Sequence, residues 1–287
     1  MSAPGHPVNA ADGRAVHTER AKAGRVAAVP ATDRLGSWRA LALPALLLVL
    51  WQLWALGLPA DTRAPYPSKV ASTLWALTAS GDLPLALVQS LGRVMAGFAC
   101  ALAVGLLLGV PMGASARLRD NLDPIIESFR PIAPMAILPI AILWFGTGTP
   151  AAVFIVAYAG FFPLIVNTVH GVMNVPRRLL QAAHTMGVPR TRILLHVLLP
   201  ASLPSVLLGA RLGMGMAWTA IIAAELAVGA KSGGGTSGGI GQMMFVFYAY
   251  SVDLNAIVVC MGVVGLVALA IDRLFRAAER RLMPWKA

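Results

Sequence analysis

One polar, basic stretch decides the fold: Pro176-Arg-Arg-Leu-Leu-Gln-Ala-Ala-His-Thr-Met-Gly-Val-Pro-Arg-Thr-Arg-Ile-Leu-Leu-His-Val-Leu-Leu-Pro200, which lies between two long apolar stretches. Pro176 suits the first turn of a helix, where its missing N–H is not needed. Gly187 suits the residue that ends this helix, since it tolerates positive φ. Pro189 can open a second short helix, which Pro200 ends or bends. The stretch therefore predicts a helix, a glycine turn and a second helix outside the bilayer, in a loop over 173–202 between two spans.

The composition indicates an integral membrane protein. Hydrophobic residues make up 57% of the 287 residues and charged residues only 12%, about half the charged share of soluble domains. Residues 1–37 are polar, without apolar periodicity, and we expect a disordered cytoplasmic tail. Residues 38–287 then form one all-α transmembrane domain.

Charge-free runs predict six transmembrane helices. The run of 46 residues from 131 to 176 contains no Asp, Glu, Lys or Arg and suits a hairpin of two helices, with the turn at Gly146-Thr-Gly-Thr-Pro150. The first run carries Trp51 and Trp54 as interfacial anchors, and a cleaved signal peptide is its alternative reading. The expected spans are 40–60, 94–116, 131–146, 150–172, 203–229 and 254–271.

Small and charged residues inside these spans have distinct expected roles. Glycines 97, 105, 109 and 113 lie on one face of the second span and favour close helix packing. Arg211, Trp218 and Glu225 in the fifth span are candidates for the translocation pathway, because intramembrane charges mark functional positions. A structural alternative is that Arg211 snorkels to the interface and Glu225 pairs within a dimer. Cys100 and Cys260 are expected as small core residues, with no metal site.

The distribution of basic residues predicts the orientation. Of the 23 Lys and Arg residues, 18 lie in the tails, in the 117–130 connection or in the 173–202 loop, and four lie on the opposite side. The positive-inside rule places both termini and this loop in the cytoplasm of a multi-pass membrane protein; the resemblance described next implies a bacterial inner (plasma) membrane. The net charge of +11 is explained by attraction to anionic lipid and needs no nucleic acid.

The opening stretch resembles the cytoplasmic loop of permease subunits of bacterial ATP-binding-cassette (ABC) importers. That family's pattern is Glu-Ala-Ala, three residues, Gly, nine residues, Ile, one residue, Leu-Pro. Gln181 and Val197 replace the family's Glu and Ile, and every spacing is kept. The matching residues, with Leu180, form the implied ATPase-coupling site: Leu180, Gln181, Ala182, Ala183, Gly187, Leu199 and Pro200. Residues 67–281 resemble more narrowly the sulfonate, taurine and nitrate group, through motifs such as Ser90-Leu-Gly-Arg93, Leu208-Gly-Ala-Arg-Leu212 and Ala223-Ala-Glu225.

The resemblance implies a type I ABC importer permease with a coupling helix. Its partners would be a cytoplasmic ATPase dimer that binds ATP and Mg²⁺, an external solute-binding protein and a second copy of the chain. The chain lacks a phosphate-binding Gly-x-x-x-x-Gly-Lys-Ser/Thr motif, so we expect a transport subunit without cofactors and not an enzyme. The solute would be small and anionic. The alternative is a secondary transporter or channel that needs no ATPase.

Overall fold

The computed structural model describes residues 37–57, 64–229 and 238–283, and every regular element in these ranges is a helix. The chain divides into two compact units, 1–57 and 58–287. The described part of the first unit is helix α2 (Ser37–Leu56), whose apolar portion is Ala42–Leu56. The end of the predicted first span, 58–60, lies outside the described residues.

The second unit begins with two helices joined by a short break. Helix α3 (Pro67–Ala79) has a proline in its first turn, and α4 (Asp82–Ala114) follows after Ser80 and Gly81. The predicted span at 94–116 is thus the second part of a 33-residue helix. Arg93 directly precedes the predicted span at 94–116 and was therefore expected in a loop, but it lies inside α4.

The third predicted span corresponds to a short helix that follows a sharp bend in the chain. Helix α5 (Ala116–Phe129) and helix α6 (Pro134–Phe145) meet at 95° across a break of four residues. Pro134 opens α6, and Ala133 before it takes extended backbone (φ −61°, ψ 137°), because a proline disfavours helical backbone in the residue before it. The turn predicted at 146–150 ends α6 and opens α7 (Thr149–Met173).

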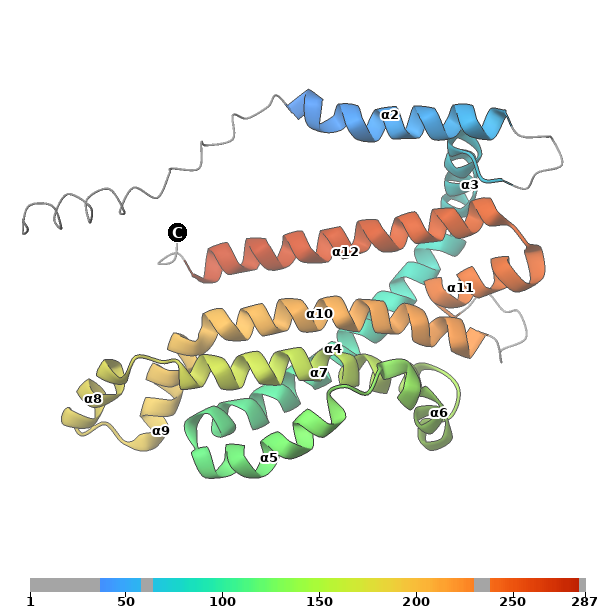
Figure 1. Cartoon of the computed structure of the whole chain (residues 1–287). Coiled ribbons are helices and arrows are strands. Elements are labelled where there is room, and N and C mark those ends of the chain that lie inside the picture. Colours follow the sequence, from blue (N-terminus) through green and yellow to red (C-terminus); the bar gives the residue numbers. More distant parts are fainter. Residues whose placement is uncertain (1–36, 58–63, 230–237, 284–287) are drawn as a thin grey trace, which may run out of the picture. The chain divides into compact units, whose positions relative to one another are not determined.

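The core of the unit is formed by α4, α7 and α10 (Leu199–Gly229), which lie side by side in Figure 1. Buried residues from all three helices form its largest apolar cluster, around Val94, Val156, Met214 and Trp218. Side chains of α12 (Leu254–Leu282), including Val264 and Phe275, pack against this cluster. Short helix α11 (Ile240–Val246) and π-turn η2 (Phe247–Ser251) connect α10 to α12.

Glycines bring α4 and α7 into backbone-close contact. A Cβ atom added at Gly97 would lie 2.6 Å from Val156, one at Gly105 2.5 Å from Leu164, and one at Gly113 2.5 Å from Val172. The small-residue face predicted for the second span is therefore confirmed, and α7 is the helix that it contacts. We call these contacts, with Gly109 against Thr168, the glycine seam. Helix α10 approaches α7 equally closely, since a Cβ atom added at Gly213 would lie 2.7 Å from the Gly160 carbonyl oxygen.

The prediction of an all-helical membrane protein is confirmed for the described residues. Within these residues the count of six spans is confirmed only in part. Four helices are long and apolar enough to cross a membrane: Asp82–Ala114, Thr149–Met173, Thr191–Ala227 and Leu254–Leu282. The bent pair α5–α6 makes five if it counts as one span. Three of the four begin or end well beyond the predicted limits. Helices α4 and α12 continue through charged residues that pair with neighbouring helices, and the helix at Thr191–Ala227 begins before the predicted start at 203.

Candidate functional site

The loop over 173–202, called the coupling loop below, forms a compact helical turn at one end of the unit (Figure 1). Helix α8 (Arg177–Thr185) starts directly after Pro176. At its end, the N–H of Met186 donates to Ala182 O, and the N–H of Val188 donates to Ala183 O. Gly187 takes φ +70° in this turn, a conformation that favours glycine. The predicted helix and glycine turn are both present.

Helix α8 has an inward and an outward face. Ala183 is buried, and Leu180 packs into a cluster with Val110, Val172 and Leu198, which anchors α8 to the ends of α4 and α7. Gln181 and Ala182 are exposed. The coupling residues predicted from the sequence therefore fall on two faces: Leu180 and Ala183 hold the helix, and Gln181 and Ala182 face outward.

The predicted coupling residue Ala182 belongs to an outward apolar stripe that also includes Leu179 and Met186, the residue that directly follows α8. Leu179 is 47% exposed and Met186 is 73% exposed, with Ala182 between them. These residues have the spacing i, i+3 and i+7, which places them on one side of a helix. We call Leu179, Ala182 and Met186 the α8 stripe. Once the inward face of α8 is known, the helical repeat predicts that these three residues face outward.

The second helix of the loop does not end at Pro200 but continues past it, whereas the sequence left open whether Pro200 ends or bends this helix. Helix α9 (Arg190–Ile193) passes through the π-turn η1 (Leu194–Leu198) directly into α10, which already contains Leu199 and Pro200. Pro200 has no N–H to donate to the preceding turn. The wider π-turn, in which Leu199 N–H donates to Leu194 O, accommodates this position without ending the helix.

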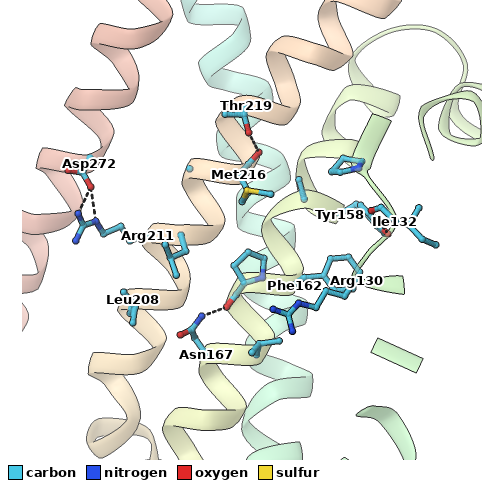
Figure 2. Close-up of a pocket in the computed structure, with 16 residues that line it drawn as sticks. Arg130, Ile132, Tyr158, Phe162, Asn167, Leu208, Arg211, Met216, Thr219 and Asp272 are labelled. Atoms are coloured by element: carbon cyan, nitrogen blue, oxygen red, sulfur yellow. Dashed lines mark hydrogen bonds and ion pairs between the residues drawn. The ribbon is translucent and has the colours of Figure 1, made fainter. Parts of the chain in front are cut away.

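A cavity of about 940 Å³ lies beside α7 and α10. Figure 2 shows its labelled side chains, with Arg130 and Phe162 on one side and Arg211 and Leu208 on the other. Most of its wall is apolar. Its polar or charged side chains are Arg130, Tyr158, Asn167, Arg211, Thr219 and Asp272.

Arg211, a predicted pathway residue, lines this cavity and pairs with α12. Its Nε and Nη2 atoms donate to Asp272 Oδ1 at 2.7 and 2.6 Å, as the dashed lines in Figure 2 show. Asp272 Oδ2 accepts a second hydrogen bond, at 2.8 Å, from Arg276 Nε. Asp272 and Arg276 were not identified from the sequence, since the span predicted at 254–271 stops before them.

Glu225, also a predicted pathway residue, is held in a buried cluster instead of facing the cavity. Its side chain is 2% exposed and pairs with Arg93 Nη1 at 2.8 Å. Ser90 Oγ lies 2.8 Å from its Oε2 atom, to which the Gly241 N–H also donates. Arg93 Nη1 additionally donates to the Gly238 carbonyl. We call Ser90, Arg93, Glu225 and Gly241 the Glu225 cluster, which ties together α4, α10 and α11.

Trp218 lies in the core. It is 2% exposed, and its indole N–H donates to Val264 O on α12 at 3.2 Å.

Of the two cysteines, Cys260 is buried as expected, whereas Cys100 is exposed on α4. The described residues contain no group of three His, Cys, Asp or Glu side chains that could hold a metal ion.

Comparisons with known proteins agree with this architecture. Residues 101–284 match the family model described as binding-protein-dependent transport system inner membrane component. The chain is 32% identical to the aliphatic sulfonates transport permease protein SsuC of Bacillus subtilis (90% of this chain, 91% of the relative). It is 34% identical to the taurine transport system permease protein TauC of Escherichia coli (85% and 87%). It is also 35% identical to the putative ABC transporter permease MJ0413 of Methanocaldococcus jannaschii (86% and 91%).

A solved structure supports the fold. The chain resembles a chain of the MetNI methionine ABC transporter with a TM-score of 0.50 and 24% identity, over 71% of this chain and 96% of the other. The family match, residues 101–284, covers the last part of α4 and the helices from α5 to α12, together with the coupling loop and the residues that line the cavity. The protein therefore belongs to the family of inner membrane components of binding-protein-dependent transport systems, the permease subunits of ABC importers.

Proposed function

We propose that this permease forms the translocation pathway for a small anionic solute and is driven by a separate cytoplasmic ATPase dimer. A solute-binding protein would deliver the solute from outside, and a second copy of the chain would complete the pathway. ATP and Mg²⁺ would bind the ATPase, because the chain has no phosphate-binding loop motif. The anionic class is supported by relatives named for sulfonate, taurine and nitrate transport.

The observation that supports ATPase coupling best is the α8 stripe. An exposed apolar line on a short helix suits insertion into a groove of a partner protein. Arg177 and Arg178 are exposed beside it and would contribute charge recognition at the rim. The inward residues Leu180 and Ala183 fix α8 to the core, so a force on the stripe would move the core and not only the loop.

The packing of the core supports a rigid-body mechanism. The coupling loop joins the end of α7 to the continuous helix α9–η1–α10. The glycine seam and the close approach of α7 to α10 leave little room for these helices to slide. When the ATPases close, α4, α7 and α10 would therefore move together, which is how two packed bodies alternate access to a central site.

The proposed orientation places both termini and the coupling loop in the cytoplasm of a bacterial inner membrane protein. It is supported by the excess of Lys and Arg in the tails, the 117–130 connection and the loop. The Glu225 cluster and α11 would then lie toward the outside, where the binding protein docks.

The test is ATPase activity in proteoliposomes that contain the permease, its candidate ATPase and a solute-loaded binding protein. Leu179→Ala with Met186→Ala shortens the α8 stripe and should reduce assembly with the ATPase and stimulated hydrolysis by about tenfold. The matched control is Met135→Ala with Leu143→Ala, since these α6 side chains are 42% and 82% exposed. The control variant should keep both assembly with the ATPase and stimulated ATP hydrolysis.

Equal ATPase assembly and stimulation in the two double variants would contradict docking through α8. Solute uptake by the permease alone, without any ATPase, would instead favour a secondary transporter or channel. Gly187→Trp gives a further check, since a side chain at φ +70° strains the turn that sets the direction of α8.

A further inference from the structure

The cavity offers few donors to a bound solute apart from its arginines. Tyr158 OH donates to Phe129 O at 2.7 Å, and Thr219 Oγ1 donates to Met216 O at 2.9 Å. Asn167 uses one amide N–H on Pro163 O at 2.7 Å. An anion that enters the cavity would therefore find its strongest donors on Arg130 and Arg211.

Arg211 is the better ordered of the two arginines. Its side chain is 27% exposed and is fixed by two short contacts to Asp272. Arg130 is 53% exposed, and its contact with Glu127 is 3.5 Å long, a surface pair of low strength. A guanidinium held in place loses less rotamer freedom when it binds a ligand.

The contact with Asp272 occupies only part of the Arg211 guanidinium. A guanidinium has five N–H donors, and Asp272 Oδ1 contacts the Nε and Nη2 atoms. The Nη1 atom lies 4.0 Å from Glu279 Oε2, beyond hydrogen-bond length. Arg211 therefore has N–H groups left to bind an oxyanion. Arg276 partly neutralises Asp272 by donating to its Oδ2 atom.

We propose that Arg211 binds the oxyanion group of the transported solute and that Asp272, held by Arg276, positions the Arg211 guanidinium. The proposal rests on the proposed function and names the group that selects the solute class. Nitrate has three coplanar oxygens, and a sulfonate has three oxygens of which any two can act as a pair of acceptors. A guanidinium can bind either anion through two N–H groups. The negative charge of Asp272 also lowers the affinity of Arg211 for the anion. A transport pathway needs this moderate affinity, because a solute bound too tightly would not leave.

The experiment is ATP-driven uptake of taurine, methanesulfonate and nitrate by the complete reconstituted complex. Arg211→Gln should lower uptake by about tenfold or more, as expected for loss of hydrogen bonds to a charged group. Arg211→Lys keeps the charge without the forked geometry and should recover uptake only in part. Arg273→Gln is the matched control, because this exposed cation on α12 does not line the cavity and its loss should change uptake by less than about twofold.

A double variant separates anion binding from a purely structural ion pair. Arg211→Gln with Asp272→Asn removes both charges of the 2.6 Å pair, so thermal stability should return toward that of the unaltered complex while uptake stays low. Recovery of uptake in the double variant would show that the pair is only structural and would overturn the proposal. Normal uptake by Arg211→Gln, or uptake by the unaltered complex of uncharged solutes alone, would also overturn it. If the unaltered complex shows no ATP-dependent uptake, the proposed function itself fails.

Discussion

At the scale of single residues, the Glu225 cluster shows a buried carboxylate that accepts hydrogen bonds from three residues on two other helices. Glu225 accepts from the Arg93 side chain, the Ser90 hydroxyl and the Gly241 N–H. Arg93 is itself only 15% exposed. Removing one member of such a pair leaves the other charge buried without compensation.

Glu225→Ala should therefore lower the free energy of unfolding by about 3–5 kcal/mol. The matched control is Glu127→Ala, since the Glu127–Arg130 pair is exposed and 3.5 Å long, and its loss should cost about 0–1 kcal/mol. Thermal unfolding of both purified variants in detergent measures the difference. If Glu225→Ala unfolds at the same temperature as Glu127→Ala, the cluster contributes no net stability.

The sequence identified Glu225 and Arg211 as unusual but not their partners. Each pairs with a residue more than 60 positions away, Arg93 or Asp272. Pairing between helices depends on their relative rotation and height, which a single sequence does not contain. Arg93 was also placed in a loop because a charge beside an apolar run looks like the end of a span.

At the scale of elements, the glycine seam makes one face of α4 sensitive to larger side chains, whereas another face of α4 tolerates them. A Cβ at Gly97 would lie 2.7 Å from the Val153 carbonyl oxygen, which is backbone and cannot move away easily. A Cβ at Gly92, on the same helix, would meet no atom within 4 Å. Sequence spacing predicted the seam because every fourth residue falls on one helix face.

Gly97→Ala should destabilise the protein by about 1–3 kcal/mol through overpacking. Gly92→Ala should be neutral or stabilise by up to about 1 kcal/mol, since alanine favours helix. Thermal unfolding of the two variants in the same detergent compares them directly. Equal stability of both would mean that α4 and α7 can separate without cost.

Element boundaries were harder to predict than element types. Pro200 was compatible with a helix end or a bend, and the π-turn at Leu194–Leu198 leads the helix past it. The third span was expected to be short, and the 95° bend between α5 and α6 accounts for its length. Both features depend on backbone adjustments that tertiary packing selects and that residue propensities do not determine.

At the scale of the whole molecule, the coupling loop and the α6–α7 turn are predicted to face opposite sides of the membrane. In a variant with Cys100 and Cys260 replaced by alanine, Met186→Cys and Thr147→Cys provide one exposed thiol each. A membrane-impermeant maleimide added to intact cells should label Thr147→Cys and spare Met186→Cys until the cells are opened. Labelling of both in intact cells would contradict the orientation derived from the basic residues.

The glycine seam has a consequence for how the protein is made. Helix α4 ends at Ala114, whereas α7, which covers its glycine face, is complete only at Met173. At about 5–20 residues per second, the ribosome needs several seconds to supply the missing helix. During this interval the narrow glycine face of α4 meets lipid in place of α7, so the newly made helix depends on what surrounds it at the insertion site until α7 arrives.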